Sequence, residues 1–393
     1  MIVAALCVAA CTGGSGPSAG TPESTGPTSS STADTPAVTA ASTVAPTTIP
    51  GFDDGPLADV CDDTIVVQAA DFPDVGAGPV YALLGASPTI DAELQTASAP
   101  VMRADGTVES TTLEIRSGGP AVGFRSPVAV MAQDDTIHLA LTSTAVAVRD
   151  RDVLVTTAVA ALTDRSGDAL LVDPATYPEI RDVTALGESG VEVRHVTDAP
   201  VIAYLASIGA LADEQLVSGS DGLPAAFVEA DGAVAQQGDL TVGPVLLPSL
   251  PQWARPVAAL AASEAGWRSL DDALLVDAAS DRLSDECLGR FVRIVQESIS
   301  AYIADPSATN AVMSTIGSQF NPLTRLTPEL FDAGTQSAID AGVFDAERDV
   351  PSGAIDTDGL DAFLAELATA LDVEPVTADE LVDPRYIDPT VTR

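Results

Sequence analysis

The side chains that most often perform catalysis are scarce in this sequence. It has two histidines and four cysteines, and all 17 basic residues are arginine, which excludes a Schiff-base lysine and a P-loop lysine. His138 lies in an apolar strand segment, where a hydrogen-bonded core histidine is expected, and His195 ends another strand. No Gly-x-Ser-x-Gly motif occurs, and no cysteines or histidines have metal-ligand spacing. The sequence predicts that the chain is not an enzyme and uses neither a metal nor a cofactor.

Groups suited to holding a ligand are more plentiful. Gly118 and Gly119 follow a predicted strand, where small residues let the backbone approach a ligand and the next helix offers free N–H groups. The alternative is an ordinary tight turn between strand and helix. Gln236 and Gln237 each carry amide donors and an acceptor, which suits a heterocyclic or amide-bearing ligand, whereas the alternative is a solvated loop.

Five other residues complete the candidate site. Asp71, Phe72 and Tyr81 can supply a hydrogen-bonding and stacking wall, although the alternative for the two rings is a place in the core. Asp221 begins an Asp-Gly step that is either a simple turn or part of the same site. Arg116 is the one nearby cation for an anionic ligand, and the alternative is that it pairs with a surface carboxylate.

Cys11 marks the expected point of lipid attachment. It ends the run Val-Ala-Ala-Cys after an apolar stretch, which resembles the lipobox of bacterial lipoprotein signal peptides. That stretch is too short to span a bilayer, and its missing basic region suggests an upstream start codon. The alternative is a chance Ala/Cys-rich terminus. Residues 1–11 are therefore predicted to be a signal peptide, and 12–60 a disordered Ser/Thr/Pro-rich tether. These features place the protein on the extracytoplasmic face of the membrane.

Composition limits the partners and describes the core. The net charge of −40 makes nucleic-acid binding untenable and opposes adhesion to anionic headgroups, so the lipid must provide the membrane anchor. The chain is 46% hydrophobic but only 4% aromatic, so Ala, Val, Leu and Ile form the core. Acid pairs such as Asp271 and Asp272 are expected on solvated surface.

Cys61 and Cys287 are the two cysteines left for the globular body. Cys7 lies in the predicted signal peptide and Cys11 takes the lipid. In an oxidising compartment the remaining pair is expected to form a disulfide, and the alternative is two separate buried thiols.

Strands alternate with helices along the chain, which predicts an α/β fold with parallel sheets and crossover helices. The predicted strands are 64–68, 113–116, 136–142, 152–162 and 191–196, and the predicted helices are 78–84, 121–131, 200–208, 283–303 and 360–371.

Several collinear motifs together resemble the substrate-binding proteins of ABC transporters. They most resemble the NMT1/THI5-like group, which contains the nitrate, sulfonate, taurine and thiamine-pyrimidine binders. The motifs are Asp71-Phe72-Pro73 with Tyr81, the run from Glu114 to Phe124, Asp173-Pro174-Ala175-Thr176-Tyr177-Pro178, Ser220-Asp221-Gly222-Leu223-Pro224, Ala235-Gln236-Gln237-Gly238, Trp253-Ala254-Arg255-Pro256, Gly266-Trp267, Asp305-Pro306 and Thr309-Asn310. The agreement covers roughly residues 61–313. The chain departs from the group at 74–78 and at 239–244, where an expected aromatic residue and a Glu-Pro step are missing.

The resemblance implies a periplasmic-binding-protein-like fold of type II, with two α/β lobes joined by two crossing segments. Lobe 1 would comprise 61–165 plus 247–393 and lobe 2 would comprise 166–246, with crossings through 153–162 and near 243–250. It also implies a monomer that binds a small polar solute between the lobes and delivers it to ABC permease subunits. The expected solute is heteroaromatic and resembles a vitamin precursor, and the alternative is an oxyanion such as nitrate or a sulfonate.

Two other classes of function stay open. One is an extracellular enzyme on the same scaffold, although the Cys-rich iron motif of the pyrimidine-synthesising relatives is absent. The other is a sensory or structural lipoprotein that has kept the fold and lost the pocket, as the departures at 74–78 and 239–244 would allow.

Overall fold

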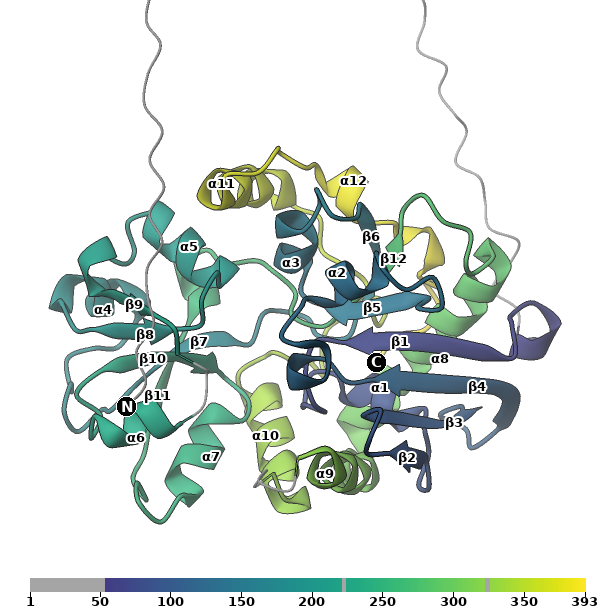
Figure 1. Cartoon of the computed structure of the whole chain (residues 1–393), viewed down its shortest axis with the longest axis horizontal. Coiled ribbons are helices and arrows are strands. Elements are labelled where there is room, and N and C mark those ends of the chain that lie inside the picture. The colour runs from purple at the N-terminus through teal and green to yellow at the C-terminus, as the bar shows by residue number, and fades with distance from the viewer. Residues whose placement is uncertain (1–53, 221–223, 322–325) are drawn as a thin grey trace, which may run out of the picture. The chain divides into compact units, whose positions relative to one another are not determined.

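Two β-sheets organise the part of the chain that the computed structural model describes, which is residues 54–220, 224–321 and 326–393. The first sheet has seven strands, which are β1 (Thr64–Ala69), β2 (Thr89–Asp91), β3 (Thr96–Met102), β4 (Val108–Arg116), β5 (Leu139–Thr142), β6 (Thr156–Ala161) and β12 (Ala273–Asp277). The second has five, which are β7 (Asp168–Val172), β8 (Val193–His195), β9 (Leu216–Ser218), β10 (Ala235–Asp239) and β11 (Ala258–Ala261). The sheets and their order along the chain can be followed in Figure 1.

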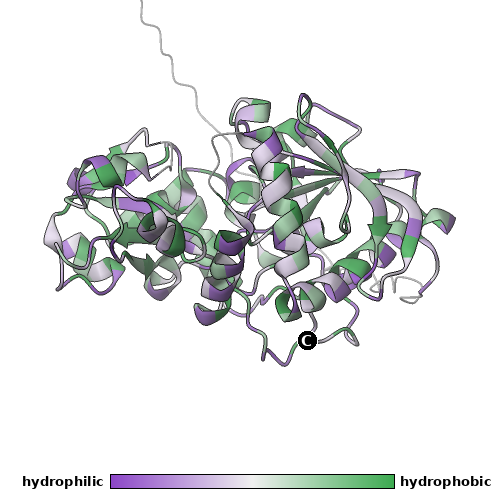
Figure 2. Cartoon of the chain, turned by 90° about the horizontal axis from the view of Figure 1, so that it is seen from below, coloured by the Kyte–Doolittle hydropathy of each residue, from purple (hydrophilic) through white to green (hydrophobic). Residues whose placement is uncertain are grey.

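Helices accompany both sheets, and we call each sheet with its helices a lobe. Lobe 2, around the five-stranded sheet, contains α4 (Val183–Ser189), α5 (Pro200–Ser207), α6 (Ala225–Glu229) and α7 (Gly243–Ser249). Lobe 1, around the seven-stranded sheet, contains α1 (Gly78–Ala82), α2 (Pro127–Met131), α3 (Thr144–Arg149), α8 (Asp285–Ala304), α9 (Ser307–Phe320), α10 (Pro328–Asp340), α11 (Leu360–Leu371) and α12 (Ala378–Leu381). Hydrophobic and hydrophilic residues are interspersed along the elements of both lobes (Figure 2). None of the described helices is long and apolar enough to cross a membrane.

Strand order explains where a site can form. In lobe 1 the order is β2-β3-β4-β1-β5-β12-β6, and β1 runs parallel to both of its neighbours, β4 and β5. The carboxyl ends of these three strands therefore share one edge of the sheet. In lobe 2 the order is β11-β7-β10-β8-β9, with β10, β8 and β9 parallel to one another. The remaining pairs are antiparallel, so both sheets are mixed rather than purely parallel as predicted.

The chain passes between the sheets twice. The first crossing is 162–167, between β6 and β7, and the second is 262–272, between β11 and β12. The two crossings are bonded to each other, since the Leu162 N–H donates to the Asp272 carbonyl at 2.7 Å. Two α/β lobes joined by two crossings confirm the predicted fold class.

The predicted positions of the crossings were wrong. Residues 153–162 hold β6, which stays in lobe 1 and pairs with β12. Residues 243–250 hold α7, because Pro244 suits the first turn of a helix and the Asp239 carboxylate accepts the Gly243 N–H at 3.3 Å. The second sheet consequently continues through β11, beyond the expected boundary at 246.

The N-terminal part of the body begins earlier than predicted. Leu57 is fully buried in the core of lobe 1, and its N–H donates to the Glu109 carboxylate at 2.9 Å. Residues 54–60 are thus ordered, because burial of this leucine offsets the entropy lost in fixing the segment. Cys11 and the rest of the predicted tether lie outside the described residues.

Cys61 and Cys287 are joined by a disulfide whose Cα atoms are 4.9 Å apart. Cys61 precedes β1, and Cys287 lies in the first turn of α8, where the Ser284 hydroxyl caps the helix by accepting the Cys287 N–H at 3.2 Å. The cross-link therefore fixes the start of the first sheet to the longest described helix.

Replacing both cysteines by serine should lower the free energy of unfolding by about 2–5 kcal/mol, because the bridge restricts a long loop in the unfolded chain. Urea denaturation of the oxidised protein and of the double variant measures this difference. As a control, reductant should bring the wild type to the level of the variant and leave the variant unchanged. Equal unfolding midpoints without reductant would contradict the prediction.

Candidate functional site

Asp71, Gly118 and Gly119 meet at the carboxyl ends of β1 and β4. The Gly118 N–H donates to the Asp71 carbonyl at 3.3 Å, and the Gly119 N–H donates to the Ala70 carbonyl at 3.0 Å. Gly119 has φ +56°, and a Cβ there would overlap the Asp71 carboxylate, while one on Gly118 would overlap the Ala70 carbonyl. Close packing of the loop after β1 against the loop after β4 therefore explains both glycines. This agrees with the alternative of an ordinary tight turn, which needs no ligand.

Phe72 and Tyr81 belong to the core of lobe 1. Tyr81 lies on α1 and is 1% exposed, and Phe72 is half-buried against the same apolar cluster. Burial, followed by the charge of Asp74, raises the pKa of Tyr81 above its usual range, so its hydroxyl stays protonated at neutral pH. Both rings therefore pack in the core, which was the alternative to a ligand-binding role. Of the two, only Phe72 remains partly exposed.

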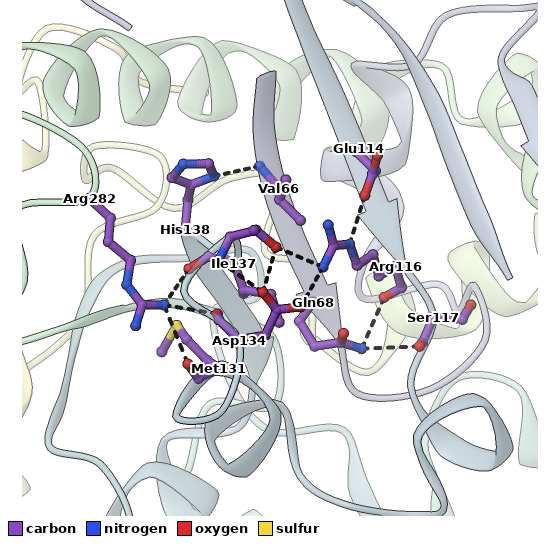
Figure 3. Close-up of polar contacts among 11 residues, drawn as sticks. Val66, Gln68, Glu114, Arg116, Ser117, Met131, Asp134, Ile137, His138 and Arg282 are labelled. Carbon is purple, nitrogen blue, oxygen red and sulfur yellow. Dashed lines mark hydrogen bonds and ion pairs between the residues drawn. The ribbon is translucent and has the colours of Figure 1, made fainter. Parts of the chain in front are cut away.

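Arg116 is held by carboxylates on the surface of lobe 1. Its Nε donates to Glu114 at 2.7 Å, and its Nη1 donates to Asp134 at 3.0 Å and to Thr136 at 3.1 Å (Figure 3). The structure therefore gives Arg116 the surface-pairing role, which was the alternative to contacting an anionic ligand.

His138 is hydrogen-bonded, as predicted, but it is half-buried at the edge of lobe 1 rather than in the core. Its Nδ1 accepts the Val66 N–H at 3.0 Å, and burial lowers the pKa of the imidazole, which favours the neutral ring (Figure 3). Arg282 binds the nearby turn by donating from Nη1 to the carbonyls of Met131, Asp134 and Ile137. These contacts fix the loop that precedes β5 and leave His138 without a catalytic partner among the residues drawn in Figure 3.

Gln236 and Gln237 lie on β10 in lobe 2. Gln237 accepts the Val196 N–H through Oε1 at 3.0 Å, which joins the end of β10 to the end of β8. Gln236 is buried and opposite Leu171 in the sheet. Neither is in the solvated loop that the sequence offered as an alternative. Asp221 lies outside the described residues.

Five aspartates from both lobes form an acidic cluster that sequence analysis did not predict. They come from the loop after β1, the start of β7, the end of β10 and the end of the second crossing, and they are Asp74, Asp168, Asp239, Asp271 and Asp272. Each is close enough to repel at least one other electrostatically, as Asp74 and Asp239 do across the lobes. Asp271 and Asp272 are half-buried and belong to this cluster, so they are not the freely solvated surface pair that the sequence predicted.

Hydrogen bonds hold most of these carboxylates in place. Asp168 accepts the Trp267 indole N–H at 2.9 Å, and Asp271 accepts the Ser166 hydroxyl at 2.9 Å as well as the Gly167 N–H. Asp239 accepts the Thr241 N–H at 2.7 Å, and Asp74 accepts the Ala77 N–H at 2.9 Å.

Asp272 differs from the other four aspartates because its carboxylate lies against the backbone of a glycine. Its carboxylate lies against Gly76, where any side chain would overlap it. Gly76, within the segment 74–78, therefore leaves the space that the Asp272 carboxylate occupies.

Burial makes the cluster difficult to ionise. Desolvation, with smaller contributions from neighbouring carboxylates, raises the pKa of Asp74 and of Asp168 to about 6. The pKa values of Asp271 and Asp272 are raised well above the usual range for the same reasons. Within the described residues no arginine forms an ion pair with any of the five, and no set of three side chains has the arrangement of a metal site. The cluster can therefore attract a cation or hydrogen-bond donors, and it repels anions.

Asp74→Asn should stabilise the protein at pH 7.5. The pKa of Asp74 is higher in the folded state than its usual 3.8, so its contribution to stability is lost as the pH rises through about 6. Asparagine keeps the acceptor for Ala77 and removes this loss, which is worth at most about 3 kcal/mol. Thermal unfolding between pH 4 and 8 should show a difference that disappears toward low pH.

Asp105→Asn serves as the control. Asp105 is an exposed turn residue whose pKa is lowered by the Thr107 N–H, so its replacement should give no stabilisation at pH 7.5. An Asp74→Asn protein that unfolds at or below the wild-type temperature at pH 7.5 would contradict the assigned cause.

The class of fold that these features define is the two-lobed α/β arrangement with paired crossings. The sequence matches no known family model and no curated protein. Among solved structures, a protein of Bordetella bronchiseptica RB50 has 12% identity and a TM-score of 0.51, covering 83% of this chain and 96% of its own. At such identity the likeness concerns the fold alone.

Two other solved structures are named for their function. The periplasmic aliphatic sulphonate binding protein SsuA from Escherichia coli has 13% identity and a TM-score of 0.49, covering 84% of this chain and 94% of its own. The ligand binding component of an ABC-type import system from Staphylococcus aureus, with zinc bound, has 12% identity and a TM-score of 0.48, covering 82% and 97%.

Proposed function

We propose that this protein is the extracytoplasmic solute-binding component of an ABC importer. It would be anchored through Cys11, bind a small polar solute between its lobes and deliver that solute to the permease. The observation that carries the proposal is the meeting of carboxylates from both lobes next to the two crossings. A binding protein of two lobes closes on its ligand by motion at such crossings.

The position of the acidic cluster supports a ligand site. In open α/β sheets, ligands bind beyond the carboxyl ends of parallel strands. Asp71 and Asp74 follow β1 and Gly118 follows β4, so these residues lie at that edge of lobe 1. Asp239 ends β10 and approaches Asp74 closely enough to repel it. A solute bound here would touch both lobes, with Asp221 and Gln237 as the proposed second-lobe wall.

Charge favours one class of solute. Several carboxylates without an arginine partner in the described ranges suit a heteroaromatic or aliphatic solute that carries a protonated nitrogen. An oxyanion such as nitrate or a sulfonate fits less well, because Arg116 is committed to Glu114 and Asp134. This choice keeps the expected vitamin-precursor-like solute and gives it a positive charge.

A second candidate function is a sensory or structural lipoprotein with no transported solute. It is favoured by contacts between the C-terminal helices of lobe 1 and lobe 2, which would resist opening. On one side Phe363 of α11 stacks with Tyr204 of α5 at 5.2 Å, and on the other the Ser337 hydroxyl of α10 donates to the Leu240 carbonyl at 2.7 Å.

Calorimetric titration should distinguish these functions. We expect aminopyrimidines or quaternary ammonium compounds to bind, and their affinity to fall as the pH drops below about 6, because Asp74 and Asp168 become protonated there. Asp74→Asn should weaken binding by about ten- to hundredfold and flatten the pH dependence, since it removes one charged partner. Asp105→Asn should bind as the wild type does.

Other results would change the proposal. Binding of nitrate or alkyl sulfonates alone would replace the cationic solute by an oxyanion. No binding across cations, pyrimidines, flavins and oxyanions would favour the second candidate. Asp221→Ala tests the second-lobe wall separately, because unchanged affinity for the bound solute would remove Asp221 from the site.

Membrane attachment is tested independently of the ligand. Cys11→Ala in the complete precursor should move the protein from the membrane fraction to the soluble fraction and abolish lipid labelling, because the thiol is the proposed acylation site. The matched control is Cys7→Ala, which should leave labelling intact. Lipid labelling that survives Cys11→Ala would contradict the anchor.

A further inference from the structure

A cavity of about 460 Å³ lies beside the crossings, away from the loops that carry Asp71, Asp74 and Asp239. Residues of both crossings and of the C-terminal segment 354–382 line it. Its size is within the range of pockets that hold small organic molecules. Trp267 connects it to the acidic cluster, since this residue lines the cavity and its indole N–H donates to Asp168.

The wall of the cavity combines apolar and polar side chains. Leu270 from the second crossing and Ile355 from the C-terminal segment line it and are half-buried, whereas Trp267, Leu360 and Val382 also line it but are almost fully buried. Such a surface favours an apolar or aromatic ligand body by removing it from water.

Arg165 is the unusual polar group of this cavity. Its Nη2 donates to the Ser263 hydroxyl at 2.9 Å, whereas its Nε is buried and has no hydrogen-bond partner among the described residues. Arg165 forms no ion pair with any carboxylate that the structure describes. The Nε atoms of Arg255 and Arg393 are likewise buried without a partner, but both of those guanidinium groups are paired with a carboxylate, so the missing ion pair is what distinguishes Arg165 from them.

The acidic residues around the cavity do not supply the missing partner. Asp164 is paired with Arg348 at 2.9 Å and with Arg393, and Asp356 is paired with Arg268 at 3.4 Å. Glu264 is exposed to solvent. Arg165 is therefore left as a cation in a cavity that also has apolar side chains in its wall, and this combination suits an amphipathic anion.

We propose that this cavity is a second small-molecule site, specific for a small organic carboxylate with an apolar body. The carboxylate would bind Arg165, and the body would lie against Leu270 and Ile355. Because both crossings line the cavity, a bound ligand would restrain the crossings, and these are the segments about which the lobes move. The proposal does not depend on the transport function.

The two tryptophans of the chain provide a direct test. In the full-length protein, Trp253→Phe leaves Trp267 as the sole indole fluorophore, and circular dichroism checks that the variant is folded. Titration with cyclohexanecarboxylate should change its fluorescence saturably, with a dissociation constant below about 1 mM. Cyclohexanecarboxamide, which has the same body and no charge, should bind about ten- to hundredfold more weakly.

Variants made in the Trp253→Phe protein test whether Arg165 is the cation that binds the carboxylate. Arg165→Gln should weaken carboxylate binding to the level of the amide, and Arg165→Lys should restore part of it. Arg181→Gln, which changes an exposed arginine outside the cavity, should have no effect. No saturable signal up to about 10 mM would overturn the site, and equal affinity for acid and amide, or full affinity in Arg165→Gln, would overturn the assignment of Arg165. If Arg165→Gln fails to fold, the comparison of acid with amide decides alone.

Discussion

The carboxylate of Asp271 holds the two crossings together, and the arrangement of both sheets depends on this contact. It accepts the Ser166 hydroxyl and the Gly167 N–H from the first crossing, while the adjacent Asp272 carbonyl accepts the Leu162 N–H. These bonds set β7 of lobe 2 beside the start of β12 in lobe 1. They also bring Asp168 and Asp272 close to Asp271, which imposes the desolvation and repulsion that raise the pKa values of the cluster.

Packing of aliphatic side chains offsets the unfavourable free energy of placing the acidic cluster between the lobes. The main core of lobe 1 is mostly aliphatic but includes buried rings such as those of Tyr81 and Phe291, and it extends into lobe 2 through Ala169, Leu240 and Ala261. Another group of rings lies where α5, α11 and the second crossing meet, with Tyr204, Trp267 and Phe363 in pairs at 5.2–5.4 Å. The low aromatic content seen in the sequence is thus compatible with a core that continues from one sheet to the other.

Elements with a strong periodic pattern could be predicted from the sequence, and the others could not. Helix α11 occupies the predicted residues 360–371, and β1 extends the predicted 64–68 by one residue. Strand β11 was missed because its sequence, Ala-Ala-Leu-Ala, lacks the β-branched residues that mark strands. The acidic cluster was missed for a different reason. Asp271 and Asp272 resemble any exposed acid pair locally, and only the return of the chain from lobe 2 brings them into the cluster and buries them in part.

The acidic cluster and the C-terminal helices act on the lobes in opposite directions. Contacts of α11 with Tyr204 and of α10 with Leu240 draw lobe 2 toward lobe 1. Ionised Asp74 and Asp239 repel each other across the same boundary, and the pKa of Asp74 near 6 means that this repulsion grows as the pH rises toward neutrality. A bound cation would cancel the repulsion and leave the attractive contacts unopposed. The charge of the solute would then supply the free energy for closure, because a ligand shifts an equilibrium between open and closed states only by its difference in affinity for the two.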